Sequence, residues 1–171
     1  MLVVGAAGAV GGLALQLARL TGAHADALVS RPDHEQAAVE LCAERARHRP
    51  QDLPRGRYAA VLDTAGTDVA AALAPAGRFV SIADHPLPDV PGARRSYVQE
   101  NATDLAHLAK LIDTDELRLR IADRFPLDDV RTAHECFEAA ASSARFSSPS
   151  EVHRVLRRRI CSQPRPSERG R

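Results

Sequence analysis

The chain opens with Leu2-Val3-Val4-Gly5-Ala6-Ala7-Gly8-Ala9-Val10-Gly11-Gly12, which runs directly into Leu13-Ala14-Leu15-Gln16-Leu17-Ala18-Arg19-Leu20. An apolar strand, a glycine-rich turn and an amphipathic helix in this order form the first unit of a nucleotide-binding βαβ fold. In that unit the start of the helix faces a phosphate. The spacing predicts that the helix packs on the sheet through its apolar residues and ends at Thr21-Gly22. These residues are Val10, Leu13, Leu17 and Leu20.

The glycine turn supplies the first candidate binding residues. Gly5 allows a sharp exit from the strand, Gly8 has no Cβ to block a diphosphate, and Gly11 allows the helix to pack closely. Position 6 is alanine where the G-x-G-x-x-G fingerprint has its first glycine, so the motif is a variant. The predicted cofactor-binding residues of the turn are Gly5, Ala6, Ala7, Gly8, Ala9, Val10 and Gly11.

Strand and helix patterns continue to alternate along the chain. Strands are predicted at residues 25–30, 58–63, 78–83 and 117–121, and helices at residues 33–45, after a cap at Asn101 or Thr103, and after Asp128-Asp129. Residues 43–54 contain no apolar run that could form a central strand. The alternation predicts an α/β fold with a Rossmann-type, doubly wound, mainly parallel sheet that is incomplete at its C-terminal edge.

Charge divides the chain into two parts. Residues 1–140 carry 15 basic and 20 acidic side chains, a net charge of −5, whereas residues 141–171 carry 8 arginines and 2 glutamates, a net charge of +6. We therefore expect a dinucleotide-binding domain at 1–140 and an Arg/Ser/Pro-rich tail at 141–171 that is too polar to fold. The tail also fits a hypothesis of out-of-frame translation, because a neighbouring frame can encode an apolar strand followed by a stop codon. Third-position bases in the gene that forbid this reading would refute it.

Several classes of function are disfavoured by the composition. The 3 cysteines are far apart, and neither they nor the 7 histidines show metal-ligand spacing, so no metal site is expected. The apolar opening lacks a preceding basic residue and is rich in glycine, which suits neither a secretory signal nor a membrane span, so a cytoplasmic location is expected. The tail arginines lack aromatic neighbours, and no nucleic-acid partner is expected.

Related enzyme classes fail on single features. A short-chain dehydrogenase needs a tyrosine four residues before a lysine, but Ala106 precedes Lys110, which is the single lysine. A P-loop needs Gly-Lys-Ser/Thr after the turn, which is absent. A methyltransferase would normally carry an acidic residue after the second strand, where Ser30 stands.

Four segments occur in the order seen in the cofactor half of the medium-chain dehydrogenases/reductases, and the chain most resembles their zinc-free quinone oxidoreductase branch. They are Val3 to Gly11, Tyr58 to Gly66, Gly77 to Ile82 and Arg124 to Glu135. The resemblance implies a reductase that transfers hydride from NADPH to a small-molecule substrate, a quinone or an activated alkene such as an enone. The family's preceding barrel-like domain and closing C-terminal strand are not found in the sequence. The alternative is therefore a non-catalytic dinucleotide-binding fragment that needs a separate substrate domain, and a homodimer is also open. No catalytic residue is identified.

Two further groups of residues are predicted to bind the cofactor. The second strand ends in Ser30-Arg31, which offers a hydroxyl and a guanidinium to a 2′-phosphate and favours NADP(H) over NAD(H). Arg31 could instead be a solvated turn residue that pairs with Asp33 or Glu35. Asp63, Thr64 and Ala65 follow another strand, where Asp63 either lines the cofactor cleft or caps a turn.

Overall fold

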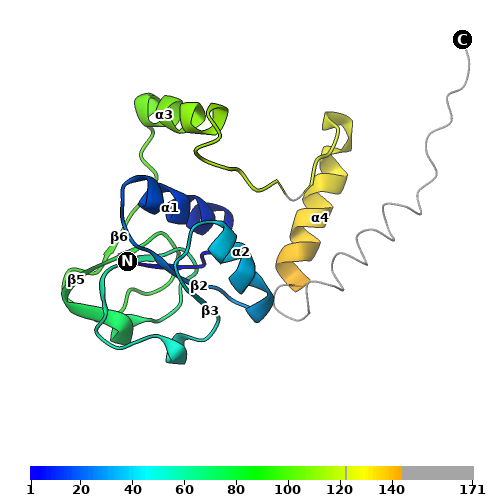
Figure 1. The fold of residues 1–171 in the computed structure, drawn as a ribbon. Helices are drawn as coiled ribbons and strands as arrows, with labels where there is room; N and C mark the ends of the chain where they lie inside the picture. The colour runs from blue at the N-terminus through cyan, green and yellow to red at the C-terminus, as the bar shows by residue number, and fades with distance from the viewer. Residues whose placement is uncertain (122, 144–171) are drawn as a thin grey trace, which may run out of the picture. The chain divides into compact units, whose positions relative to one another are not determined.

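In a computed structural model, residues 1–121 and 123–143 of the chain are described. Residues 1–120 form one unit, which contains a six-stranded sheet with the order β3-β2-β1-β4-β5-β6, and every neighbouring pair is parallel (Figure 1). The strands are β1 (Leu2–Val4), β2 (Asp26–Leu28), β3 (Ala46–Arg47), β4 (Tyr58–Asp63), β5 (Leu73–Ser81) and β6 (Arg94–Arg95). This is the strand order of the Rossmann fold, so the predicted α/β class is confirmed. The sheet does not close on itself, and both of its edge strands have two residues.

The helices follow the strands in the expected alternation. The first unit contains α1 (Ala9–Leu20), α2 (Glu35–Glu40) and α3 (Ala102–Asp113), with 3₁₀ turns η1 (Pro32–His34), η2 (Pro50–Asp52) and η3 (Ala70–Ala72). The second unit begins at Ile121 and contains η4 (Leu127–Asp129) and α4 (Val130–Ser143). Asn101, one of the two predicted caps, accepts hydrogen bonds from the amides of Thr103 and Asp104.

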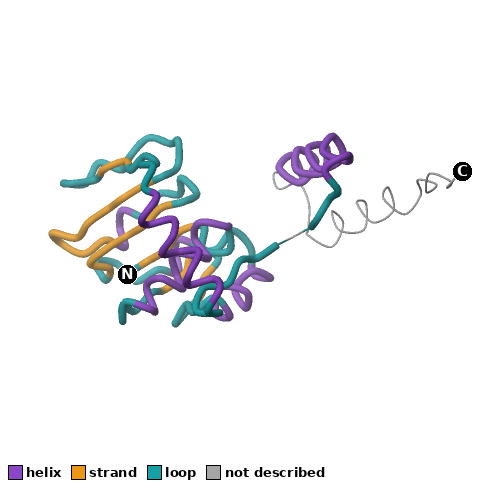
Figure 2. Tube along the Cα trace, turned by 90° about the horizontal axis from the view of Figure 1, so that it is seen from above, coloured by secondary structure: helices purple, strands orange, loops and turns teal. Residues whose placement is uncertain are grey.

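Two apolar clusters lie on opposite faces of the sheet, because successive strand residues point to opposite sides. Val3 belongs to the cluster beneath α1 and α2, whereas Leu2 and Val4 belong to the other cluster with Val61 and Phe79. The second face is covered by loop segments and by η2 and η3 instead of full helices (Figure 2). The sheet therefore has a helical layer on one face and a thinner covering on the other.

The predicted inner face of α1 is wrong. Val10 and Leu20 are 52% and 44% exposed, and the helix instead buries its glycines and the residues Leu15, Gln16 and Ala18. A Cβ atom on Gly11 would lie 2.4 Å from the carbonyl oxygen of Gly5, so the helix backbone approaches the turn too closely for a side chain. The small residues, not the largest apolar ones, determine which side of the helix meets the sheet.

Three predicted element boundaries also need correction around the second βα unit. Strand β2 covers residues 26–28 of the predicted 25–30, and α2 ends at Glu40 although the prediction continued to residue 45. Cys42 has a φ of 80°, a left-handed conformation that stops the helix. The segment without an apolar run forms β3, which tolerates polar residues because it is an edge strand.

Two strand predictions differ from the structure later in the chain. Strand β5 starts at Leu73 instead of Arg78, and the pairing with β4 shifts register around Ala76, whose φ is 60°. The predicted strand at 117–121 is wrong, because this segment joins no sheet. The side chain of Gln16 hydrogen-bonds the amide and the carbonyl of residue 118 in place of a neighbouring strand.

The predicted domain boundary at residue 140 stays a prediction. The described residues divide at residue 120, within the range assigned to one domain from the sequence. The tail from residue 144 to 171, and with it most of the segment predicted to be disordered and out of frame, lies outside the described residues. No helix among the described residues is long and apolar enough to span a membrane.

Candidate functional site

A cleft of about 420 Å³ opens at the carboxyl ends of the parallel strands β1, β2, β4 and β5. In open α/β sheets this edge is where ligands bind. Eight of the twelve residues predicted to bind a cofactor line the cleft, together with two that were not predicted. The eight are Gly5, Ala7, Gly8, Ala9, Val10, Ser30, Thr64 and Ala65, and the two are His34 and Ile82.

A smaller cavity of about 130 Å³ continues the cleft toward β3. It shares Gly5, Ser30 and Ala65 with the main cleft and also touches His48, the residue after β3. The two cavities therefore follow the strand ends from β5 to β3. Their course suits an extended ligand better than a compact one.

The glycine turn is held in place by backbone hydrogen bonds. The amides of Gly5 and Ala6 both donate to the carbonyl oxygen of Leu28 in β2, and the amide of Gly8 donates to the carbonyl oxygen of Gly5 at 2.9 Å. The amide of Gly12 donates to the carbonyl oxygen of Gly8, which closes the first turn of α1. The N–H groups of residues 9–11, the first residues of α1, point toward the start of the helix. Together with the helix dipole they favour an anion at that position.

The three glycines of the turn have different steric roles. Gly5 has a φ of +73°, and a Cβ atom there would lie 2.4 Å from Oγ1 of Thr64. A Cβ atom on Gly11 would collide with the backbone of Gly5, whereas one on Gly8 would lie 3.1 Å from the Gly5 carbonyl oxygen. Gly5 is required by its positive φ and by packing, and Gly11 by packing, whereas Gly8 lines the cleft and a Cβ atom there would make one tight contact.

Asp63 organises the loop after β4. Its side chain is 3% exposed, and its Oδ1 accepts hydrogen bonds from the amides of Ala65 and Gly66 at 3.0 and 2.8 Å. The structure therefore places Asp63 as the cap of the turn, one of the two roles considered for it. Thr64 donates from Oγ1 to the carbonyl oxygen of Val4 at 2.7 Å, which fixes the β4 loop against the glycine turn.

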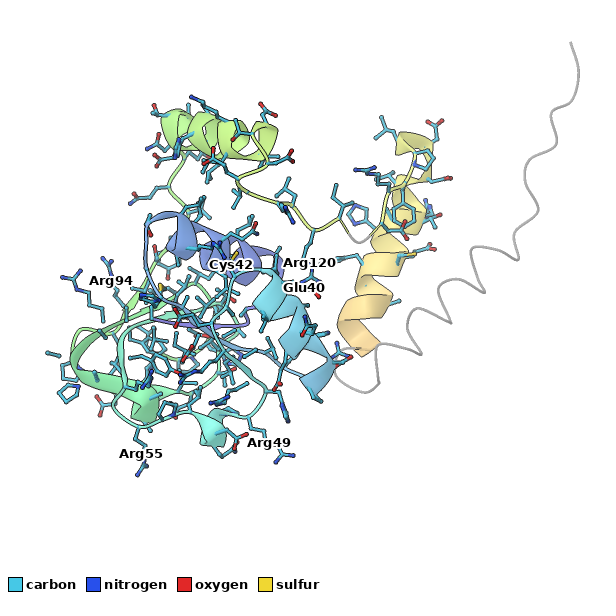
Figure 3. The ribbon with its side chains drawn as sticks, viewed as in Figure 1. Glu40, Cys42, Arg49, Arg55, Arg94 and Arg120 are labelled. Carbon is cyan, nitrogen blue, oxygen red and sulfur yellow. The ribbon has the colours of Figure 1, made fainter. Side chains whose placement is uncertain are left out.

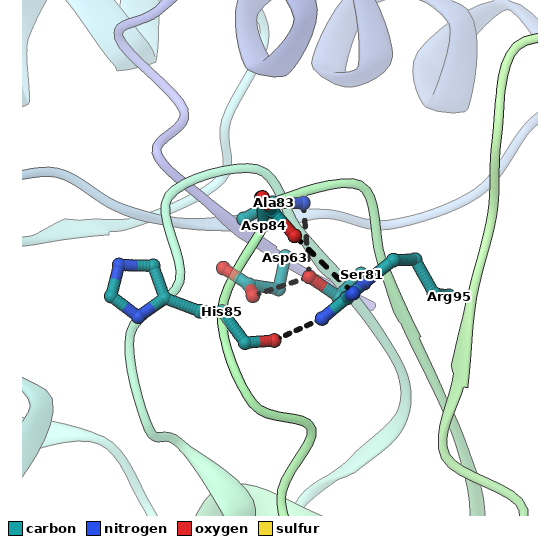
Figure 4. Close-up of polar contacts among 6 residues, drawn as sticks. All are labelled: Asp63, Ser81, Ala83, Asp84, His85 and Arg95. Carbon is teal, nitrogen blue, oxygen red and sulfur yellow. Dashed lines mark hydrogen bonds and ion pairs between the residues drawn. The ribbon is translucent and has the colours of Figure 1, made fainter.

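A polar network joins this loop to the loop after β5 (Figure 4). The hydroxyl of Ser81 donates to Oδ2 of Asp63 at 2.8 Å and accepts from the amide of Ala83. Arg95 in β6 contacts Asp84 at 3.4 Å and donates to the carbonyl oxygen of His85. The network fixes the backbone on both sides of Ile82, which lines the cleft.

The β2 end of the cleft contains Ser30 and His34. Ser30 is exposed and lines the cleft, whereas Arg31 precedes η1 and is not among the lining residues. His34 lies at the end of η1, and its Nδ1 is buried without a hydrogen-bond partner among the described residues. The sequence predicted helical structure from residue 33, but it did not indicate that His34 faces the cleft. Ile82 could have been found, because it directly follows a predicted strand.

Ala6 and Gly11 are fully or largely buried beneath the cleft and do not line it. They support the turn from inside. A nicotinamide dinucleotide fits the cleft, because the glycine turn leaves space where a side chain would intrude and the amides of the helix start face that space.

The sequence of the chain matches a known protein family. The family model described as zinc-binding dehydrogenase matches residues 23–143. The chain therefore belongs to this family, which is part of the medium-chain dehydrogenase/reductase superfamily and depends on nicotinamide dinucleotides. The predicted family is confirmed. A search of curated proteins found no significant match.

Solved structures of several enzymes resemble the chain. The quinone oxidoreductase from Coxiella burnetii is 28% identical with a TM-score of 0.65, and the match covers 80% of this chain and 48% of that one. The quinone oxidoreductase of Pseudomonas syringae pv. tomato DC3000 is 22% identical with a TM-score of 0.63, covering 86% and 54%. Acetophenone reductase from Geotrichum candidum, solved with NAD, is 19% identical with a TM-score of 0.65, covering 80% and 44%. The chain thus spans about half the length of these relatives.

The zinc in the family's description has no fitting ligand set in the described part of the chain. No group of three or more His, Cys, Asp or Glu side chains is placed there to hold a metal ion. The cleft is lined by small residues, by the polar side chains of Ser30, His34 and Thr64, and by the apolar side chains of Val10 and Ile82.

Proposed function

We propose that this chain is the NADP(H)-binding part of an oxidoreductase similar to the quinone oxidoreductases, which in the whole protein transfers hydride to a quinone or an activated alkene. The observation that carries the proposal is the cleft at the start of α1, where eight predicted binding residues meet. Membership of the zinc-binding dehydrogenase family supports it, and so does the likeness to the Coxiella burnetii quinone oxidoreductase.

The residues of the cleft divide the binding task among them. The amides at the start of α1 bind the diphosphate, since Gly8 leaves room for its approach. Ser30 meets the adenosine ribose at the end of β2. Val10 and Ile82 supply apolar surface that keeps water from the nicotinamide. The bound nicotinamide supplies the hydride.

The preference for NADP(H) is part of the proposal. The end of β2 carries Ser30 and Arg31, and none of the residues that line the cleft is Asp or Glu. An acidic residue at this position would bind the ribose hydroxyls of NAD and repel a 2′-phosphate. The Ser30 hydroxyl can donate a hydrogen bond to a phosphate, and Arg31 follows it directly, so the chemistry of the strand end favours the phosphorylated cofactor.

A second candidate function is a non-catalytic dinucleotide-binding fragment. The match to the Coxiella burnetii enzyme covers 48% of that enzyme, so about half of the relative's fold is left unmatched. Hydride transfer requires an acceptor held about 3 to 3.5 Å from the nicotinamide in a cleft without water. The described cleft supplies the cofactor side of that arrangement. We propose that a separate substrate domain or a second copy of the chain supplies the other side.

Two measurements test these proposals in order. Calorimetric titration of the 171-residue chain with NADPH and NADH should give binding of both, with NADPH the tighter ligand. Oxidation of NADPH is then followed with small quinones. Turnover at about 1 to 1000 per second by the chain alone would refute the fragment reading. Binding without turnover supports it, and absence of binding to either dinucleotide overturns the proposed function.

A further inference from the structure

The positively charged guanidinium of Arg120 contacts the glycine turn, although the two are far apart in the sequence. Its Nη1 donates a hydrogen bond of 2.8 Å to the carbonyl oxygen of Ala7, which lines the cleft two residues before α1 begins. Figure 3 shows Arg120 on the extended segment that follows α3. The contact spans 113 positions of the sequence. No signal in the sequence links these two residues.

The segment that carries Arg120 is fixed to α1. Gln16 is 6% exposed and forms two hydrogen bonds with the backbone of Arg118. Its Nε2 donates to the Arg118 carbonyl oxygen, and its Oε1 accepts from the Arg118 amide at 2.8 Å. Leu117, the preceding residue, is 2% exposed. A buried amide side chain with these hydrogen bonds holds the backbone in one place. The position of Arg120 is therefore set by the fold two residues before it.

Arg120 forms no ion pair with any residue that the structure describes. Among the described residues, no carboxylate lies within ion-pair distance of its guanidinium, and none of the residues that line the cleft is Lys or Arg. A guanidinium has five N–H donors, and the contact with Ala7 accounts for one of its nitrogens. The helix start supplies the equivalent of about half a positive charge. A dinucleotide diphosphate carries two negative charges, so the helix start alone leaves it under-compensated.

We propose that Arg120 binds the diphosphate of the nicotinamide dinucleotide with the donors that Ala7 does not use. The inference rests on the proposed function and adds to it a residue outside the glycine turn. Because the diphosphate is common to both cofactors, Arg120 contributes equally to the binding of NADPH and NADH. Arg31, in contrast, is proposed to distinguish them through the 2′-phosphate. The two arginines therefore have separable effects on affinity and on selectivity.

Three variants of the full chain test the proposal. Arg120→Gln removes the charge, Arg120→Lys keeps it, and Arg118→Gln removes an exposed arginine from the same segment as a matched control. Dissociation constants for NADPH and NADH are measured by calorimetry at about 0.01 M and about 0.5 M salt, where charges are screened weakly and strongly. Circular dichroism and the melting temperature show whether each variant folds.

We expect Arg120→Gln to weaken both cofactors by a similar factor, about three- to thirtyfold at low salt, and by less at high salt. Arg120→Lys should retain most of the affinity, and Arg118→Gln should match the wild type. An equal loss at both salt concentrations, accompanied by a lower melting temperature, would show that Arg120 only supports the turn and would overturn the proposal. Unchanged affinity in Arg120→Gln would overturn it as well, while the proposed function stands. A wild-type chain that binds neither cofactor refutes both.

Discussion

The hydroxyl of Ser81 donates a 2.8 Å hydrogen bond to Oδ2 of Asp63, and this bond joins the carboxyl ends of β5 and β4. Both side chains are almost fully buried, at 2% and 3% exposure. The loop after each strand contributes to the cleft, through Ile82 on one side and Thr64 and Ala65 on the other. The shape of this end of the cleft depends on a buried polar pair.

Replacing Ser81 with alanine leaves Oδ2 of Asp63 buried without its donor. We expect Ser81→Ala to lower the free energy of unfolding by about 1 to 3 kcal/mol, measured by urea denaturation. Asp68→Asn is the control, because Asp68 is exposed and caps Ala70 with an oxygen that asparagine retains. A Ser81→Ala variant as stable as this control would show that the pair contributes little.

Two adjacent glycines of α1 should respond differently to a methyl group. A Cβ atom on Gly11 meets backbone atoms of Gly5 and Ala6, whereas one on Gly12 meets the flexible end of Leu41 at 2.9 Å. Gly11→Ala should lower the free energy of unfolding by about 1 to 3 kcal/mol. Gly12→Ala should change it by less than about 1 kcal/mol, since alanine's helix propensity offsets the crowding. Thermal melts of the two variants check the order, and similar melting temperatures would contradict it.

Arg31 should affect the choice of cofactor more than the affinity for both. Arg31→Ala removes a charged donor next to Ser30, and we expect it to weaken NADPH by about 1.5 to 3 kcal/mol more than NADH. Parallel calorimetric titrations with the two cofactors measure the difference. Arg49→Ala, an exposed arginine outside the cleft lining, serves as the control. Equal losses for NADPH and NADH would remove Arg31 from the 2′-phosphate role.

Tyr58 should make the fold sensitive to alkaline pH. Burial, followed by the hydrogen bond that its hydroxyl donates to Asp26 at 2.8 Å, raises the pKa of Tyr58 from 10.0 to about 12. The folded state thus favours the neutral phenol. This stabilisation is complete below the unfolded pKa and is lost as the pH rises through about 12. Unfolding free energies should therefore fall between pH 10.0 and about 12 in the wild type.

The controls for this pH dependence are two phenylalanine variants. Tyr58→Phe should lose this pH dependence between pH 10.0 and about 12. Near neutral pH it should be about 1 kcal/mol less stable than the wild type, because the variant lacks the hydrogen bond to Asp26. Tyr97→Phe should behave like the wild type, because Tyr97 is 76% exposed. A wild-type curve that matches the Tyr58→Phe curve throughout the range would refute the role of Tyr58.

The sequence allowed the first βα unit and β4 to be predicted, because their signals are local. An apolar strand that ends in a glycine turn before a helix places Gly5, Gly8 and Val10 at the carboxyl end of β1, where the cleft opens. The end of β4 follows the same rule, and Thr64 and Ala65 line the cleft. Such contacts depend on neighbouring positions along the chain, so a pattern reveals them.

The remaining features depend on contacts between distant residues. The inner face of α1 is set by the approach of Gly11 to Gly5, and the segment at 117–121 is held by Gln16 instead of a strand. His34 reaches the cleft through a short turn with no apolar pattern. Cys42 stops α2 in a left-handed conformation that residue type alone does not predict.

The central claim is that a nicotinamide dinucleotide binds at the start of α1, and backbone amide chemical shifts test it most directly. Nitrogen-15 NMR spectra of the chain are recorded with increasing NADPH, with Gly8→Val as the matched variant, because a larger side chain there fills the approach to the turn. We predict the largest shifts at the amides of Ala7 to Val10 and of Thr64 and Ala65, with no saturable shifts in the variant. Shifts confined to the separate cleft around Val69 to Ala72, or none at the glycine turn, would contradict the account.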